Sequence, residues 1–293
     1  MMPKVLLTGA TGYIGGKLLP ILVQSGNEVH TLLRSGRKPT TQLDGVTHHT
    51  LDGIGAMARV FQQNTFAAVI HLATYYDHAV THNGVAEMMQ SNISLGAELL
   101  QMMDSNGCRR LLNITTCAEF GSQGQFAPNS LYAASKRAFR DISHYYTGCR
   151  QFHVVDLVFY DNYGPDDPRD KIVNLLFRHL DSPDPLLVSP GEQLLNLVHI
   201  DDTVRAIVTG LGVLNAIPLS NKSSRLLYSV APENPVTLKT LAQEIENTTG
   251  RKINIVWGGK PYRENQIMEP WRTEILPNWE ARISLREGLK SIA

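Results

Sequence analysis

The stretch that decides the fold reads Leu7-Thr8-Gly9-Ala10-Thr11-Gly12-Tyr13-Ile14-Gly15. Gly9, Gly12 and Gly15 form a G-x-x-G-x-x-G pattern, which follows an apolar run at residues 5–8 and precedes an amphipathic stretch at residues 13–25. A strand, a glycine turn and a helix in this order can bind a phosphate, because the glycines let it approach the backbone and the helix N-terminus attracts its charge. The pattern therefore predicts a dinucleotide-binding turn, and a purely structural turn is the alternative.

Short apolar runs alternate with helical stretches through the first half of the chain. We predict strands at residues 5–8, 28–33, 67–72, 110–114 and 152–159, and helices at residues 13–25, 85–105 and 130–146. Strands that are apolar on both faces and alternate with helices are typical of a parallel sheet covered by helices. The sequence therefore predicts an α/β fold with a Rossmann-like, doubly wound parallel sheet.

After Tyr160 the alternation gives way to loops rich in proline and aspartate, with short helices expected at residues 171–180, 202–214 and 238–249. We expect a dinucleotide-binding domain at residues 1–160, with segments near residues 195–231 packing back on it. Residues 161–293 would form a smaller mixed α/β lobe that binds the substrate.

Composition limits the kinds of partner. The 293 residues are 43% hydrophobic and 18% charged, and 27 basic residues balance 27 acidic ones. Nucleic-acid and membrane-surface binding usually need a basic excess, so we expect neither. Cys108, Cys117 and Cys149 lack metal-type spacing, and no metal is predicted. The chain has no apolar run of membrane-spanning length and no signal-peptide pattern, which favours a cytoplasmic protein.

The end of the second predicted strand favours NADP over NAD. An NAD enzyme usually carries an acidic residue there, which binds the ribose 2′-hydroxyl, whereas the run from His30 to Lys38 holds none. Arg34 stands at that place and Arg37 follows closely. Guanidinium groups match a phosphate in a fork geometry, so we predict that both bind the 2′-phosphate of NADP(H). A solvated basic loop is the alternative.

Tyr132 and Lys136 form a Y-x-x-x-K pair on a predicted helix. Residues four apart share a helix face, so the ammonium can lie near the phenol and lower its pKa from about 10. Such a phenol can exchange protons with a substrate. Upstream, Thr115 and Thr116 end a predicted strand, where a hydroxyl could polarise a carbonyl. Each pattern alone also arises by chance or from strand propensity.

Taken in order, the glycine turn, the threonine pair and the Y-x-x-x-K pair resemble the extended short-chain dehydrogenase/reductase family. Further likenesses are His71-Leu72-Ala73-Thr74 to the H-L-A-A stretch of the family, Asp52-Gly53 to its adenine-contacting Asp, and Tyr163-Gly164-Pro165, preceded by Asn162, to its N-x-Y-G-P stretch. Near the C-terminal end, W-E-A-R-I-S-L-R-E-G-L at residues 279–289 resembles its closing motif. The resemblance spans nearly the whole chain.

The resemblance implies a role for each of these residues. Tyr132 would be the general acid in ketone reduction, and Lys136 would lower its pKa and hold the nicotinamide ribose. Asn92 would complete the catalytic set as the structural Asn of the central helix. Thr116 would polarise the carbonyl, with Thr115 the less favoured choice. The predicted cofactor-binding residues are Gly9, Thr11, Gly12, Tyr13, Ile14, Gly15, Arg34, Arg37, Asp52, Leu72, Ala73, Thr74, Tyr132, Lys136 and Phe159. The predicted substrate-binding residues are Thr115, Cys117, Asn162, Lys171 and Asn174.

The resemblance also narrows the reaction. Sugar dehydratases of this family carry Asp-Glu directly after the catalytic Thr, whereas this chain has Cys117-Ala118, with Glu119 one position further on. Four-epimerases of this type generally retain NAD, which the basic run at Arg34 disfavours. We therefore expect NADPH-dependent reduction of the 4-keto group of a nucleotide-activated 4-keto-6-deoxyhexose, as in sugar reductases of the abequose and paratose synthase type.

Three other functions stay open: a nucleotide-sugar epimerase, a reductase of another carbonyl compound and, less favoured, a non-catalytic NADP-sensing protein. One departure from the family bears on the substrate. Many nucleotide-sugar members have a phosphate-contacting Arg two residues before the aromatic of an R-D-W-like segment. This chain has Leu195-Asn196-Leu197 there, so that contact is missing, and Arg263 and Arg272 are candidate replacements. The helices at residues 85–105 and 130–146 form the dimer interface in many members, so the resemblance implies a homodimer.

Overall fold

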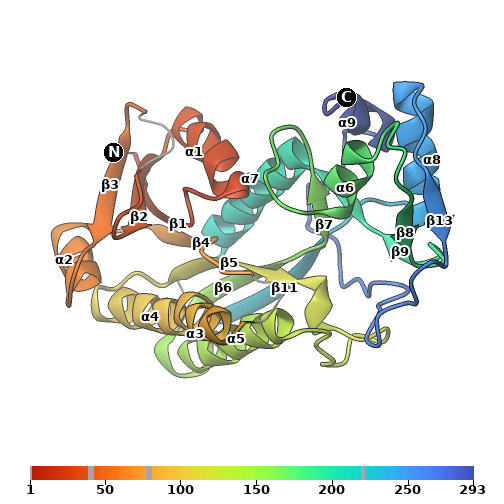
Figure 1. The fold of residues 1–293 in the computed structure, drawn as a ribbon. Helices are drawn as coiled ribbons and strands as arrows, with labels where there is room; N and C mark the ends of the chain where they lie inside the picture. Colours follow the sequence, from red (N-terminus) through yellow and green to blue (C-terminus); the bar gives the residue numbers. More distant parts are fainter. Residues whose placement is uncertain (1, 39–42, 77–80, 219–221) are drawn as a thin grey trace.

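A computed structural model describes residues 2–38, 43–76, 81–218 and 222–293. Its centre is a seven-stranded sheet in the order β11-β6-β5-β4-β1-β2-β3, with every neighbouring pair parallel (Figure 1). The strands are β1 (Lys4–Thr8), β2 (Glu28–Arg34), β3 (Val46–Leu51), β4 (Ala68–His71), β5 (Arg110–Thr116), β6 (His153–Phe159) and β11 (Ser224–Val230). The order reverses between β1 and β4, which is where sheets of this kind open a crevice for ligands.

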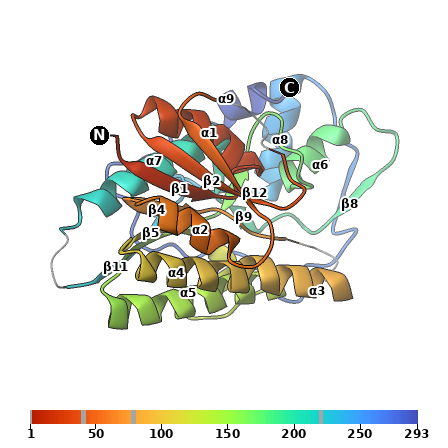
Figure 2. The same ribbon diagram turned by 90° about the vertical axis from the view of Figure 1, so that its left-hand side faces the viewer.

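Helices cover both faces of the sheet (Figure 2). On one face, α1 (Tyr13–Gln24) and α7 (Ile200–Ala216) share a hydrophobic core with the central strands, with Leu18 and Ile207 fully buried in it. On the other face lie α2 (Ala56–Gln63), α4 (Leu95–Ser105) and α5 (Leu131–Arg150), with Leu99 and Phe139 at the centre of a second core. The predicted Rossmann-like α/β fold is confirmed.

The structure differs from the sequence prediction at several elements. The edge strands β3 and β11 and the helix α2 were not predicted: β3 carries four polar residues among six, α2 has only eight residues, and β11 is only partly buried over most of its length. The single helix expected at residues 85–105 is three elements: α3 (His82–Met89), a π-helical turn η1 (Gln90–Ser94) and α4. A π turn inside a helix is uncommon and often marks a functional site.

The second lobe has its own hydrophobic core, which includes Leu176, Leu241 and Leu289. Its elements are β7 (Asp161–Tyr163), α6 (Ile172–Arg178), β8 (Leu186–Val188), β9 (Leu194–Leu195), β10 (Leu197–His199), β12 (Val236–Thr237), α8 (Leu238–Thr249), β13 (Ile255–Trp257) and α9 (Leu285–Lys290). Asp202 on α7 joins this lobe to the sheet, because its carboxylate accepts hydrogen bonds of 2.9 Å from the backbone N–H groups of Arg282 and Ile283. Within the described ranges, no helix combines the length and the apolar character needed to cross a membrane.

Candidate active site

A cleft of about 890 Å³ lies at the carboxyl ends of the central strands, where the second lobe meets the sheet. Its walls are the glycine turn, the ends of β2, β4, β5 and β6, the first turns of α5, and loops of the second lobe. The cleft therefore joins the residues predicted for a cofactor to several of those predicted for a substrate. Among the described residues, no group of three or more His, Cys, Asp or Glu side chains is placed to hold a metal ion.

The glycine turn is shaped for close backbone packing and for a ligand. Gly9 has φ = 75°, and a Cβ there would lie 2.7 Å from the backbone nitrogen of Ala73. A Cβ on Gly15 would overlap the Gly9 carbonyl oxygen. On Gly12 a Cβ would meet only that same oxygen, at 3.3 Å, and would otherwise face the cleft. Gly9 and Gly15 thus hold the turn against its neighbours, while Gly12 leaves room for a phosphate beside the start of α1.

The predicted nucleotide residues lie along the same cleft, with one exception. Arg34 and Arg37 are exposed and line its outer end. Asp52 lies outside the cleft lining drawn from the described residues; its carboxylate is exposed and 4.0 Å from the Arg59 guanidinium, while Leu51 beside it lines the cleft. The remaining cofactor residues that line the cleft are Thr11, Tyr13, Ile14, Leu72, Ala73, Thr74 and Phe159.

Asn92 sits in the π turn and ties three segments together. Its Oδ1 accepts hydrogen bonds from the Tyr75 N–H at 2.7 Å and from the Thr74 hydroxyl at 3.1 Å. Its Nδ2 donates to the Tyr75 carbonyl at 3.0 Å and to the Ser135 Oγ at 2.9 Å. Asn92 therefore fixes the segment after β4 against the turn of α5 that lies between Tyr132 and Lys136.

Burial displaces the pKa of both members of the Y-x-x-x-K pair. Ser130 caps α5 by accepting from the Ala133 N–H at 3.2 Å, which places Tyr132 and Lys136 in the first two turns, facing the cleft. Burial raises the pKa of Tyr132 to about 12, and a hydrogen bond with Thr74 lowers it in part. Burial lowers the pKa of Lys136 to about 8, against the effect of Glu119 and Asp156. The Tyr132 phenol therefore stays protonated at neutral pH, whereas the Lys136 ammonium loses its proton at a pH only a little above neutral.

The two threonines at the end of β5 differ in their surroundings. Thr115 is buried, and its hydroxyl donates to the Glu119 carboxylate. Thr116 is half-buried, and its hydroxyl accepts from the Ala118 N–H at 3.2 Å at the start of the short 3-10 turn η2 (Cys117–Glu119). Both line the cleft; the Thr115 hydroxyl is bound to Glu119, whereas the Thr116 hydroxyl interacts with the Cys117 thiol and lowers the pKa of that group in part.

The predicted substrate residues separate into two groups. Cys117, Asn162 and Lys171 line the cleft, and burial raises the pKa of the Cys117 thiol far above its usual value. The Oδ1 of Asn162 is buried and has no hydrogen-bond partner among the described residues. Asn174 instead supports the loop before α6, because its Nδ2 donates to the carbonyls of Asp167 and Arg169 at 2.8 Å.

Sequence reasoning missed several cleft residues on the substrate side. Asp161 and Arg169 both line the cleft, as do Tyr76 and residues 264–267; Arg263, which also lines the cleft, was already a candidate from the sequence. Burial raises the pKa of Asp161, while Lys171 and Arg169 lower it. The ring of Tyr76 packs edge-on against Tyr132, with centroids 4.8 Å apart. Asp161 could have been found from the sequence, because it is next to Asn162, which belongs to the predicted N-x-Y-G-P stretch. Arg169 and Tyr76 lie in loops without a motif, so the sequence offered no signal for them.

Comparisons with known proteins agree with this geometry. The family model described as "NAD dependent epimerase/dehydratase family" matches residues 5–218. A CDP-abequose synthase from Yersinia pseudotuberculosis is 25% identical over 279 residues, which cover 91% of each chain. A UDP-glucuronate 4-epimerase from Thermodesulfobacterium geofontis is 22% identical and covers 99% of this chain and 94% of its own. A UDP-glucose 4-epimerase from Brucella ovis, solved in complex with NAD, superimposes with a TM-score of 0.82 at 17% identity over 99% of this chain and 97% of its own.

Proposed function

The chain belongs to the NAD dependent epimerase/dehydratase family, and from that premise we propose that it is an NADPH-dependent reductase of the 4-keto group of a nucleotide-activated 4-keto-6-deoxyhexose. The observation that carries the proposal is the cleft itself. Thr116, Tyr132 and Lys136 line it together with the glycine turn, Arg34 and Arg37. The first three suit carbonyl chemistry, and the two arginines suit a ribose phosphate.

The binding residues fit a nicotinamide dinucleotide at the sheet edge. The open space over Gly12 and the N-terminus of α1 would receive the pyrophosphate. Arg34 and Arg37, as the cationic groups at the end of β2, would hold a 2′-phosphate in place of the 2′-hydroxyl that NAD carries. Lys136 would hold the nicotinamide ribose. When bound there, the cofactor supplies the hydride.

The remaining chemistry belongs to this chain. The Thr116 hydroxyl donates a hydrogen bond to the C4 carbonyl oxygen and polarises it. As hydride reaches C4, the Tyr132 phenol gives its proton to the same oxygen, so the ketone becomes a secondary alcohol. The Lys136 ammonium stabilises the phenolate that this leaves, and Tyr132 recovers a proton from solvent through the cleft. Burial holds the pKa of Tyr132 at about 12, so the phenol starts protonated; the lowering predicted from the Y-x-x-x-K spacing is not seen, and the mechanism relies on the Lys136 ammonium to stabilise the phenolate as it forms.

The structure of η2 favours reduction over dehydration. A dehydratase needs a carboxylate beside the substrate to remove a proton. Glu119 is fully buried, is bound by Arg140 at 2.7 Å, and accepts from the Thr115 hydroxyl. Ala118 rather than an acid lines the cleft next to Cys117.

The substrate class follows from the second lobe and from the relatives. Asn162, Asp161 and Lys171 present an amide, a carboxylate and an ammonium to the cleft, which together suit the hydroxyls and the diphosphate of a nucleotide sugar. An adjoining pocket of about 350 Å³, which shares Leu194 and Pro270 with the cleft and includes Arg272, adds room for a base. The relatives named above act on CDP- and UDP-sugars by their names. The homodimer and the cytoplasmic location stay predictions.

The test is to follow NADPH absorbance while the purified protein is offered CDP-, dTDP- and GDP-4-keto-6-deoxyhexoses, with NADH in parallel. Rapid, stoichiometric oxidation of NADPH by one of these sugars is expected. Interconversion of a UDP-hexose and its C4 epimer, without net consumption of cofactor, would instead make the protein an epimerase.

A further inference from the structure

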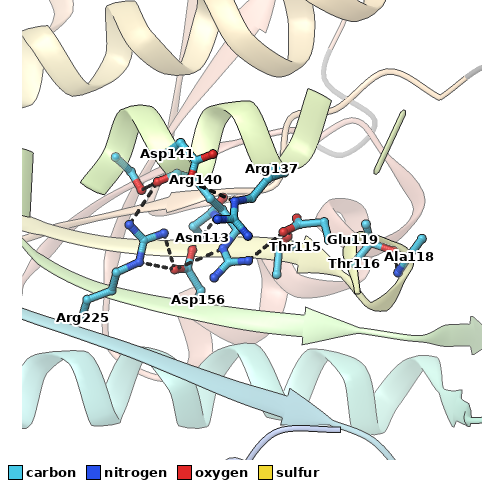
Figure 3. A network of polar contacts seen from close by, with 11 residues as sticks. Asn113, Thr115, Thr116, Ala118, Glu119, Arg137, Arg140, Asp141, Asp156 and Arg225 are labelled. Carbon is cyan, nitrogen blue, oxygen red and sulfur yellow. Dashed lines mark hydrogen bonds and ion pairs between the residues drawn. The ribbon is translucent and has the colours of Figure 1, made fainter. Parts of the chain in front are cut away.

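Figure 3 shows a network of charged side chains, formed by Glu119, Arg140, Asp156 and Arg225, that begins beside the threonine pair at the end of β5. Glu119 and Asp156 are fully buried, and Arg140 is 8% exposed. The Arg140 guanidinium lies 2.7 Å from the Glu119 carboxylate and 3.6 Å from that of Asp156. Asp156 also accepts from Asn113 at 2.7 Å and pairs with Arg225 at 2.9 Å. The network thus links η2, α5, β5, β6 and β11 across one face of the sheet.

This network has an exposed end and a catalytic end. At one end Arg225 is partly exposed on the edge strand and also donates to the Arg140 carbonyl at 3.0 Å. At the other end Glu119 holds Thr115, the residue before Thr116, and so anchors the turn that carries the Thr116 hydroxyl. Arg140 follows Lys136 by four residues, so both lie on one face of α5. The carboxylate of Glu119 therefore reaches the threonine turn and the lysine helix together.

Stability alone does not account for such an arrangement. Removing two carboxylates and a guanidinium from water is costly, and replacing buried ion pairs by apolar side chains is often neutral or stabilising. Phe120 already packs against Arg140, with the guanidinium carbon 5.4 Å from its ring centre. Apolar side chains in place of the charged ones could therefore pack against Phe120. Buried hydrogen bonds and ion pairs between distant segments are better suited to fixing one geometry, although the Arg140 Nε and the Asn113 Oδ1 lack a hydrogen-bond partner among the described residues.

We propose that Glu119 is a positioning residue of the catalytic site: held by Arg140 and Thr115, it fixes the turn that presents Thr116 and places a carboxylate, through Arg140, beside the face of α5 that carries Lys136. Burial raises the pKa of Glu119, and the Arg140 guanidinium and the Thr115 hydroxyl oppose that rise. The two carboxylates of Glu119 and Asp156 balance the two guanidiniums of Arg140 and Arg225, so the network adds no net charge.

The charged groups around Lys136 come from four elements. Glu119 on η2 and Asp156 on β6 favour its ammonium form. His71 on β4 is neutral, because burial and the charge of Lys136 lower its pKa to about 3. Tyr132 on α5 is uncharged at neutral pH, and the Arg140 charge is matched by its two carboxylates. Removing the charge of Glu119 is therefore expected to make Lys136 lose its proton at a lower pH.

The test compares Glu119→Gln, which removes the charge, with Glu119→Asp, which keeps it but shortens the reach to Thr115. The matched control is Asp104→Asn, a carboxylate paired with Arg109 at 2.9 Å and 15% exposed, on α4 and outside the cleft lining. The pKa of Lys136 is measured by NMR on the protein with ¹³C-methylated lysines, the resonance being identified by its loss in Lys136→Arg. This readout needs neither cofactor nor substrate, so it stands even if the proposed reductase activity fails.

We expect Glu119→Gln to lower the pKa of Lys136 by about half a unit or more, with Glu119→Asp and Asp104→Asn within about 0.2 units of the unmodified protein. A folded Glu119→Gln protein with an unchanged Lys136 pKa would overturn the charge role.

A second arm rests on the proposed function. In the reduction assay, Glu119→Gln should move the alkaline fall of kcat to lower pH, and Glu119→Asp should reduce kcat about tenfold or more, with the fall at its original pH. If Glu119→Gln does not fold, Glu119→Asp decides the positioning role, since a wild-type kcat in that variant contradicts it. A full kcat for Glu119→Asp combined with an unchanged Lys136 pKa in Glu119→Gln would reduce the network to a structural element.

Discussion

The two halves of the cleft are built in different ways. The cofactor half is made from the ends of β1, β2, β4 and β5 and the first turns of α1 and α5, so its geometry follows from the sheet. The substrate half is made from Asp161, Asn162, the loop with Arg169 and Lys171, and the segment at residues 263–267. Regular elements fix backbone direction and side-chain spacing, whereas loops tolerate change. We therefore propose that the first half carries the common chemistry of the family and that the second half sets the choice of substrate.

The Tyr132→Phe variant tests the place where the cofactor half and the substrate half of the cleft meet. It should give the largest change in kcat. Without the phenol proton, kcat for reduction is expected to fall by roughly 10² to 10⁴-fold, while the Kd for NADPH, measured by fluorescence titration, changes little. Tyr145→Phe is the matched control, because Tyr145 is exposed on the same helix, and it should leave both values unchanged. Wild-type turnover in Tyr132→Phe is incompatible with the proposed mechanism.

Gly15→Ala tests whether backbone packing builds the cofactor half. Its Cβ would overlap the Gly9 carbonyl oxygen, so the free energy of unfolding should drop by about 2 kcal/mol or more and NADPH binding should weaken. Gly212→Ala in α7 is the control, since nothing lies within 4 Å of its added Cβ; it should stabilise the protein by up to about 1 kcal/mol. Urea denaturation measures both, and equal effects would show that the crowding at Gly15 is unimportant.

Arg34→Ala combined with Arg37→Ala sharpens the cofactor half at its outer end. If these guanidiniums hold the 2′-phosphate, the Kd for NADPH should rise about tenfold or more, which corresponds to ~1.4 kcal/mol, and the Kd for NADH should stay constant. Lys17→Ala is a control, because its ammonium pairs with Asp166 at 3.2 Å instead. If the Kd values for NADPH and NADH rise together, or if neither rises, the basis for preferring NADP is removed.

Asn162→Ala probes the substrate half and carries the smallest expected effect. Because its buried Oδ1 lacks a partner among the described residues, truncation should leave the free energy of unfolding unchanged or higher, while KM for the nucleotide sugar rises several-fold. Asn174→Ala should instead lower the free energy of unfolding by about 1 to 2 kcal/mol, because it removes two hydrogen bonds of 2.8 Å. A destabilised Asn162→Ala protein with unchanged KM would assign Asn162 to the fold alone.

The contrast between the halves also explains what the sequence could predict. The glycine turn, the threonine pair and the Y-x-x-x-K pair are local patterns, because one strand end or one helix face contains each of them. From these patterns the fold was predicted correctly, and the structure gathers Thr116, Tyr132 and Lys136 at one cleft.

What the sequence could not predict depends on contacts between distant segments. The π turn that places Asn92 has no simple residue pattern, and the Glu119–Arg140–Asp156 network joins side chains up to 37 positions apart in the chain, which only the folded sheet brings together. Asn174 looked like a ligand residue because it begins a helix near Lys171, yet it binds the backbone of its own loop.

The most direct measurement is to supply NADPH carrying deuterium at C4 of the nicotinamide, on either face in separate reactions, together with the nucleotide 4-keto-6-deoxyhexose that oxidises it. NMR and mass spectrometry of the sugar product then locate the label. One deuterium at C4 of the product, transferred from one face only and in equal amount to the NADPH consumed, is expected. A sugar that changes configuration with no deuterium at C4 and no consumption of NADPH would contradict the reductase.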